Sequence, residues 1–301
     1  MTLGFESYHP AINLIYFVSA IAGTIVFRQP VFLAISYLGA FAYCVKRNGR
    51  KGLVFNLCLI PLVGLFALYY SGYHHFGVTV LRQNFIGNNM TLEALLCGLT
   101  LGIAAAAVAI WLSCVFSVFT ADKVVYLFGR VSPKLSLFLS ILLRMIPRLK
   151  AQAKKISTAR KAIGRGVNQG TLPMRCSNAM KIVSILITWL LESLTTTSDS
   201  MRSRGYALKG RTAFSIYRFD NRDRGLVIGL FACLTVVLMG HLLGQTGIRY
   251  DPRILMNPVT PMSYVFYVGF AIFCLLPLGL ELWSAYRFRQ GEASGDAASE
   301  I

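Results

Sequence analysis

The chain has 301 residues, of which 55% are hydrophobic and only 14% are charged, and its mean hydropathy is +0.58. Because soluble domains carry roughly 25% charged residues, this composition excludes an ordinary soluble protein and indicates one that resides in a bilayer. The net charge of +18 does not indicate a nucleic-acid partner, since Lys and Arg beside membrane spans mark the cytosolic face or contact anionic membrane lipids.

Six apolar segments approach the roughly 20 residues that a helix needs to cross the hydrocarbon core. In chain order they are Ala11–Phe27, Pro30–Val45, Leu53–Tyr70, Glu93–Ala121, Gly225–Gly244 and Met262–Trp283. The first segment lacks a preceding basic region and a following cleavage site, so we expect it to be retained as a helix. The turn before Pro30 is short enough to require an antiparallel hairpin, with the proline starting the second helix. The pattern predicts an all-α integral membrane protein with about six transmembrane helices.

These segments divide the chain into three parts: N-terminal transmembrane helices over 1–121, a basic region over 122–224, and C-terminal transmembrane helices with a short cytosolic tail over 225–301. Within the basic region, Arg144 to Arg224 hold seventeen Lys and Arg against four acids. Its apolar pieces, such as Leu135–Leu143 and Ile182–Leu191, are too short to cross. We therefore expect amphipathic helices that lie under the bilayer as a cytosolic or interfacial coupling region.

The positive charges predict the orientation of the chain in the membrane. If the N-terminus is cytosolic, the outer loops hold only Arg28, Arg82, Arg249 and Arg253, which leaves 26 of the 30 Lys and Arg inside. We therefore expect a multi-pass protein of the cell membrane with both termini in the cytosol. Asn84–Asn89 is then outside, and Gly166–Pro173 is inside.

The fourth segment carries a stripe of small residues. Gly98, Gly102 and Ala106 recur at four-residue spacing, which places them on one helix face and lets a neighbouring helix approach closely. We expect this stripe to serve helix packing.

The chain offers little catalytic chemistry. It contains no GxxxxGK[ST] phosphate loop and no HExxH, GxSxG or GxGxxG motif. The seven cysteines include no CxxC pair, and the four histidines are scattered or adjacent, so we expect no metal site and no cofactor. Ionisable residues of the spans, such as Glu93 and Glu281, lie at span boundaries, where a solvated anchor is the simplest interpretation. An enzyme is therefore not expected.

Two sites in the basic region place an arginine beside glycine: Gly164-Arg165-Gly166 and Ser203-Arg204-Gly205. A glycine after an amphipathic helix can form its left-handed cap, and an arginine in the last turn interacts well with the carbonyl end of the helix. Both sites can therefore be simple helix ends. Alternatively, a rigidly presented arginine can make forked hydrogen bonds to a carboxylate of a partner protein.

The order of these features resembles the transmembrane T component of energy-coupling factor (ECF) transporters, the CbiQ/EcfT-like family. The resemblance is carried by the opening His9–Ile15 with Pro30, by Arg144–Pro147, and above all by Thr197–Tyr206. It covers the chain from its opening to about Arg224, and the second Arg-Gly site is its most specific part.

The resemblance implies a non-catalytic scaffold that couples two ABC-type ATPases to a substrate-binding S component in the membrane, for uptake of a vitamin or a transition-metal ion. In that family two short Ala-Arg-Gly-like motifs on cytosolic helices dock into the ATPases. Arg204 matches the second motif, with Ser203 as the small residue and Gly205 in place. For the first motif the match is either Arg165, flanked by Gly164 and Gly166, or Arg160, which follows an alanine; Arg165 keeps the small-Arg-Gly order. The substrate itself would be selected by the S component.

Two other classes of function remain open from the sequence. A self-sufficient secondary transporter or channel would require polar or charged groups at the centre of the spans, which the sequence lacks. A membrane-bound enzyme or lipid-binding protein could use the basic region as a patch for lipid headgroups.

Overall fold

The computed structural model describes residues 4–74, 76–83, 89–206, 217 and 219–299. It divides the chain into two compact units, each described by itself: residues 1–120 with 217–301, called here the membrane unit, and residues 121–216, called the basic unit. Both are built almost entirely from helices, so the prediction of an all-α membrane protein is confirmed.

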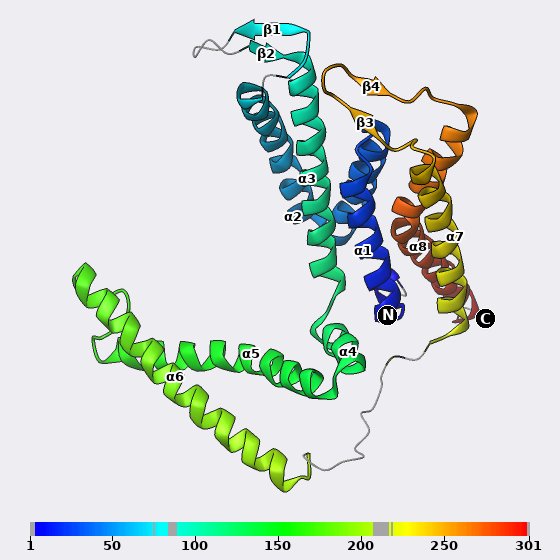
Figure 1. Ribbon diagram of the computed structural model, residues 1–301. Coiled ribbons are helices and arrows are strands. Elements are labelled where there is room, and N and C mark those ends of the chain that lie inside the picture. Colours follow the sequence, from blue (N-terminus) through cyan, green and yellow to red (C-terminus); the bar gives the residue numbers. More distant parts are fainter. Residues whose placement is uncertain (1–3, 75, 84–88, 207–216, 218, 300–301) are drawn as a thin grey trace. The chain divides into compact units, whose positions relative to one another are not determined.

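In its described residues the membrane unit contains five α-helices and two short antiparallel hairpins. The helices are α1 (Pro10–Val26), α2 (Pro30–Tyr73), α3 (Leu92–Val118), α7 (Asn221–Leu242) and α8 (Pro261–Ser299), preceded by a 3-10 turn at Phe5–Ser7. The hairpins are β1 (Val80–Gln83) with β2 (Asn89–Thr91), and β3 (Ile248–Arg249) with β4 (Leu255–Met256). Figure 1 shows both hairpins at one end of this unit and both chain ends at the other. Most of the predicted outer segment Asn84–Asn89 lies outside the described residues.

Helix α2 is two antiparallel helical arms joined at Gly49, whose φ of 58° and ψ of −137° are not helical. The Asn56 amide Nδ2 donates to the Phe41 carbonyl oxygen at 3.5 Å, whereas fifteen residues of unbroken helix would span about 22 Å. A Cβ built on Gly52 would lie 2.7 Å from the Cys44 carbonyl oxygen, which also requires a reversal. The arms contain the predicted segments Pro30–Val45 and Leu53–Tyr70.

This turn gives a direct test of the reversal. Gly49→Ala is expected to lower the free energy of unfolding by about 1–2 kcal/mol, because an L side chain is strained at positive φ. The matched control is Gly64→Ala, in the second arm, because both glycines have open space around a built Cβ and only Gly49 has positive φ. The thermal unfolding temperature of each purified variant is measured. Equal stability of the two variants would contradict the reversal at Gly49.

Five described helices are long and apolar enough to cross a membrane by length and composition: α2, α3, α7, α8 and, in the basic unit, α6. Helix α1 is apolar but has 17 residues. The six predicted segments correspond to α1, the two arms of α2, α3, α7 and α8. The largest boundary difference is at α8, which continues to Ser299 instead of ending at Trp283. Smaller differences include α3, which ends at Val118 instead of Ala121, and α7, which begins at Asn221 instead of Gly225.

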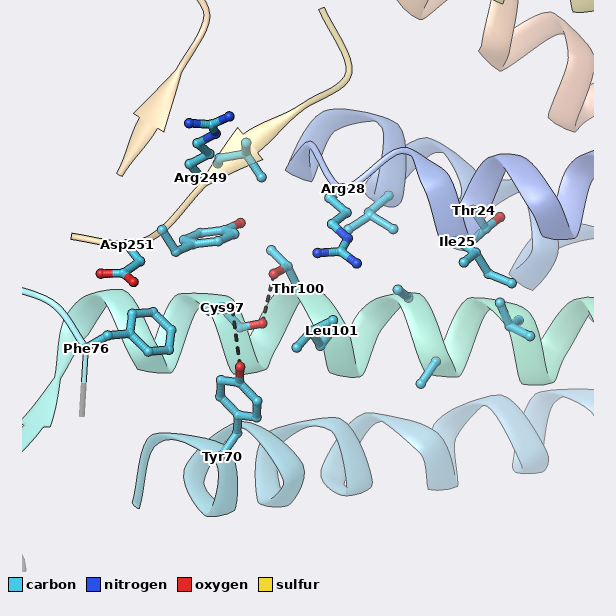
Figure 2. Close-up of a pocket in the computed structure, with 16 residues that line it drawn as sticks. Thr24, Ile25, Arg28, Tyr70, Phe76, Cys97, Thr100, Leu101, Arg249 and Asp251 are labelled. Atoms are coloured by element: carbon cyan, nitrogen blue, oxygen red, sulfur yellow. Dashed lines mark hydrogen bonds between the residues drawn. The ribbon is translucent and has the colours of Figure 1, made fainter. Parts of the chain in front are cut away.

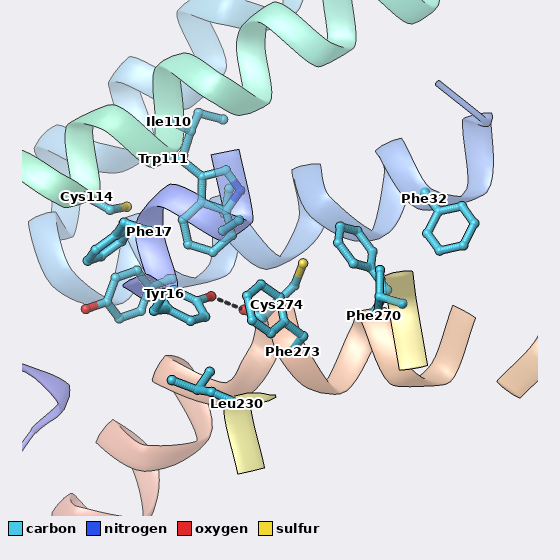
Figure 3. Close-up of a cluster of buried hydrophobic side chains, with 14 of the residues drawn as sticks. Tyr16, Phe17, Phe32, Ile110, Trp111, Cys114, Leu230, Phe270, Phe273 and Cys274 are labelled. Atoms are coloured by element: carbon cyan, nitrogen blue, oxygen red, sulfur yellow. Dashed lines mark hydrogen bonds between the residues drawn. The ribbon is translucent and has the colours of Figure 1, made fainter. Parts of the chain in front are cut away.

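The core of the membrane unit is rich in aromatic side chains from α1, α2, α3 and α8 (Figure 3). Trp111 is fully buried, and its indole Nε1 donates to the Ser36 hydroxyl oxygen at 3.1 Å. That hydroxyl also lies 2.6 Å from the Thr24 hydroxyl, and the Tyr16 hydroxyl donates to the Cys274 carbonyl oxygen at 3.2 Å. These bonds satisfy polar groups that would otherwise be costly in an apolar environment.

The small-residue stripe of α3 packs against the second arm of α2. A Cβ on Gly98 would lie 2.9 Å from the Tyr70 Cβ, and one on Gly102 would lie 3.1 Å from Val63 Cγ1. The two helices therefore approach closely where the side chains are smallest, as the spacing predicted.

The basic unit consists of α4 (Ala121–Val131), α5 (Pro133–Ala162) and α6 (Leu172–Ser203). The Ser136 hydroxyl joins α5 to α4 by donating to the Val125 carbonyl oxygen at 3.2 Å. One argument from the sequence was wrong. The apolar pieces Leu135–Leu143 and Ile182–Leu191 are parts of helices of 30 and 32 residues, and α6 is long and apolar enough to cross a membrane. Shortness therefore does not keep α6 out of the bilayer, and its interfacial position stays a prediction.

Candidate functional site

Helix α6 ends in a Schellman motif that places Arg204 at its tip. Gly205 adopts a φ of 72°, its N–H donates to the Arg202 carbonyl oxygen at 3.0 Å, and the Tyr206 N–H donates to the Met201 carbonyl oxygen at 3.2 Å. Arg204 is the residue directly before this left-handed glycine, and its side chain is exposed. The glycine therefore fixes where the helix stops and sets Arg204 at the stop.

Helix α5 ends in the same motif, built around Gly164 with a φ of 70°. The Gly164 N–H donates to the Lys161 carbonyl oxygen at 3.2 Å, and the Arg165 N–H donates to the Arg160 carbonyl oxygen at 2.9 Å. A Cβ on Gly164 would meet nothing within 4 Å. Glycine is therefore favoured here by the backbone conformation and not by crowding.

The two arginines occupy different positions in these motifs. Arg204 precedes its left-handed glycine, whereas Arg165 follows Gly164, so the residue equivalent to Arg204 in the first motif is Ile163. The repeated Arg-Gly pattern suggested equivalent helix ends. Both helices end in the same type of cap, but Arg204 comes directly before its left-handed glycine and Arg165 comes directly after its own.

The loop after Arg165 is held by side-chain hydrogen bonds. The buried Gly166 N–H donates to Gln169 Oε1 at 2.9 Å, and its carbonyl oxygen accepts from Asn178 Nδ2 at 3.3 Å. Arg165 itself is exposed, and no hydrogen bond or ion pair of its side chain is found within the described residues. Arg165 thus lies between a fixed helix end and a fixed glycine, with its guanidinium available.

Arg160, the alternative docking residue, lies in the last turn of α5 and is half-buried. Its Nε and one terminal nitrogen are shielded from solvent and have no hydrogen-bond partner among the described residues. Its guanidinium is therefore less available to a partner protein than that of Arg165.

Exposed apolar side chains lie at the end of α5 and at the start of α6, on either side of Arg165 in the sequence, a feature that the sequence analysis missed. Ile163 is 68% exposed, and Leu172 and Met174 at the start of α6 are 79% and 59% exposed. A cation flanked by exposed apolar side chains is a typical composition for the centre of a protein interface. The clue in the sequence was three large apolar residues that flank a segment rich in glycine and polar residues.

The two arginine-bearing ends lie far apart. Arg165 precedes the first turn of α6 and Arg204 follows its last turn, and α6 has 32 residues. At about 1.5 Å per residue the helix is about 48 Å long. One groove on one partner cannot hold both arginines.

Nothing in the described part of the chain gathers three or more His, Cys, Asp or Glu residues that could hold a metal ion. All seven cysteines are free thiols, and three of them, Cys44, Cys114 and Cys274, are buried in the membrane unit. The candidate site therefore consists of arginines, glycines and apolar side chains, a composition suited to binding a protein surface.

No protein-family model matches the chain. It is 33% identical over 110 residues to the energy-coupling factor transporter transmembrane protein EcfT of Lactococcus lactis subsp. cremoris (strain MG1363). That similarity covers 35% of this chain and 40% of the relative, so the chain matches less than half of the relative's length. It confirms the resemblance drawn from the residues and agrees with a multi-helix membrane protein.

Proposed function

We propose that the chain is the scaffold and energy-coupling subunit of an ECF-type ABC importer, itself without enzymatic activity. It would transmit movement from two ATPases to an S component that carries a vitamin or a transition-metal ion. The observation that carries this proposal is the pair of arginine-bearing Schellman ends at opposite ends of α6.

The separation of these ends supports two ATPase subunits instead of one. Because Gly166 contacts Asn178 of α6, about 26 residues, or roughly 39 Å of helix, lie between them. Each arginine would therefore enter a groove of its own, and α6 would connect the two grooves as a single rod. A rod held at both ends moves as one body when its two supports approach each other. ATP-driven closure of paired ATPases would thus reach the membrane unit as a displacement of the basic unit.

If the chain is a scaffold subunit, ATP is hydrolysed by its partner ATPases and not by the chain itself. Since the chain has no phosphate loop, the purified protein alone is expected neither to bind nor to hydrolyse ATP. Hydrolysis should appear when ATPases encoded by the same genome are co-expressed and recovered with it. The rate of ATP hydrolysis by each preparation is measured as steady-state phosphate release. Robust turnover by the isolated, contaminant-free chain would overturn the scaffold assignment.

The charge distribution predicts which side of the membrane each loop faces. In a cysteine-free background, Asn168→Cys in the α5–α6 loop should react with an impermeant thiol reagent only after cells are opened. Val259→Cys, in the loop before α8, should react in intact cells, as should a cysteine within 84–89. Both Asn168 and Val259 are exposed on the protein surface, so labelling depends only on the side of the membrane on which each residue lies. Labelling of Asn168→Cys in intact cells would reverse the topology.

The alternative of a self-sufficient transporter or channel gains no support from the structure. Glu93 lies in the first turn of α3, where its carboxylate accepts hydrogen bonds from the Thr79 N–H and from the Thr79 hydroxyl at 2.7 Å. Arg47 pairs with Glu6 and donates to Ser117 at the end of α3. These charged groups serve the ends of helices and do not line a path across the membrane unit.

A further inference from the structure

The membrane unit contains a cavity of about 660 Å³ at the end that carries the two hairpins (Figures 1 and 2). Its walls come from α1, α2, α3 and the β3 strand with the residues that follow it. The volume lies within the roughly 300–1,000 Å³ of small-molecule sites. Nothing in the proposed function uses this cavity.

One side of the cavity is apolar. Ile25 of α1 faces Leu101, Ala104, Ala105 and Val108 of α3 across it. The small alanines leave the groove open along about two turns of α3. Such a wall favours an alkyl chain and offers no polar partner to a hydrophilic solute.

The hairpin end of the cavity is cationic. Arg28 and Arg249 line it with a single acid, Asp251, and neither arginine has an ion pair among the described residues. Figure 2 shows the Arg28 guanidinium over Leu101 of α3, whereas the Arg249 guanidinium points away from α3. The charge of this end is therefore net positive, and both arginines are exposed.

Polar groups next to Arg28 are only partly satisfied. The Thr100 hydroxyl donates to the Cys97 carbonyl oxygen at 2.9 Å. The Tyr250 hydroxyl is shielded from solvent and has no partner in hydrogen-bonding geometry, although Thr100 lies close enough to act on it. Burial is the main cause that raises the pKa of Tyr250. A protonated tyrosine hydroxyl can donate a hydrogen bond to an anion.

We propose that this cavity binds one anionic phospholipid, with the phosphate at Arg28 and the Tyr250 hydroxyl and an acyl chain along the Ala104–Val108 face of α3. A phosphate-bearing amphiphile matches both halves of the cavity. A free phosphate would leave the apolar wall empty, and an uncharged alkyl chain would leave Arg28 unpaired. The proposal is independent of the transport function proposed above, because it rests on the membrane unit alone.

The test uses the full chain, purified in an uncharged detergent and stripped of lipid. Phosphatidylglycerol, phosphatidylcholine and inorganic phosphate are added in separate samples. Native mass spectrometry measures the bound lipid, and a thermal melt measures the unfolding temperature. We expect phosphatidylglycerol to bind as one molecule and to raise the unfolding temperature, and phosphatidylcholine to do so more weakly. Inorganic phosphate should produce no shift. A full shift with phosphate alone would overturn the lipid assignment.

Two variants locate the site. Arg28→Gln should weaken phosphatidylglycerol binding by about tenfold, since it removes a charge-assisted contact. Arg253→Gln is the matched control, because Arg253 lies in the β3–β4 loop at the same end of the membrane unit but does not line the cavity. Should Arg28→Gln not yield folded protein, Ala104→Leu narrows the apolar wall without changing charge and should weaken binding likewise. Equal binding by the folded cavity variants and by Arg253→Gln would place the lipid elsewhere and overturn the proposal.

Discussion

Arg204→Glu is expected to abolish both the recovery of one ATPase with the chain and the uptake of substrate. Removal of one charged partner from a desolvated interface costs about 2–5 kcal/mol, and charge reversal adds repulsion. The change lies at the tip of α6 and outside the membrane unit, so membrane insertion should be unaffected. Affinity purification with quantification of the ATPases measures the first effect, and uptake of labelled substrate by whole cells measures the second.

Arg202→Glu is the charge-matched control for this variant. Arg202 lies two positions earlier, on a different face of the last turn of α6, and is also exposed. An arginine that lies at the rim of an interface or faces lipid contributes little, so this variant should retain most ATPase recovery. Equal impairment by Arg202→Glu and Arg204→Glu would mean that the basic unit acts as a diffuse charged surface.

Arg165→Glu is expected to remove the second ATPase contact by a comparable factor. Its position is fixed by the Gly164 cap on one side and by the hydrogen bonds of Gly166 on the other. The negative side chain would therefore be held where the guanidinium was. The same purification measures the loss, and the Arg165→Glu, Arg204→Glu double variant should retain neither ATPase.

Arg160→Glu separates the two interpretations of the first motif. Arg160 is half-buried, so its replacement should lower the stability of the α5 end more than it lowers ATPase binding. A milder effect than Arg165→Glu on ATPase recovery, at equal amounts of folded protein, supports Arg165 as the docking residue. The opposite order would assign docking to Arg160.

The sequence was sufficient to predict the helical architecture of the membrane unit. Long apolar runs separated by charges or proline placed α1, both arms of α2, α3, α7 and α8, because hydrophobicity and length dominate the choice of a span. Even the reversal at Gly49 was implied by the cluster of Lys and Arg between two apolar segments. Helix ends were less predictable, since capping contacts such as the one between Asp220 and Asp223 extend α7 beyond its apolar run.

Prediction was weaker where local hydrogen bonds or distant segments decide the geometry. Gly164 and Gly166 both flank Arg165, and only the hydrogen bonds show that Gly164 takes the left-handed conformation. The sequence analysis did not predict that α6 is one long helix, because it considered the short apolar pieces without the polar helical turns that connect them. The cavity corresponds to no sequence motif, since Arg28 lies in the α1–α2 turn and Tyr250 follows β3, more than two hundred residues later in the sequence.

The central claim is tested most directly by the composition of the complex that the full chain forms with its partners. The chain is co-expressed with the ATPases of its own genome, and the mass of the purified assembly is determined by native mass spectrometry. We predict one copy of this chain with two ATPase subunits and one further small membrane protein, reduced to one ATPase or none by Arg204→Glu and unchanged by Arg202→Glu. A chain that purifies without ATPase, or that binds it equally well with Arg204 reversed, would contradict the account.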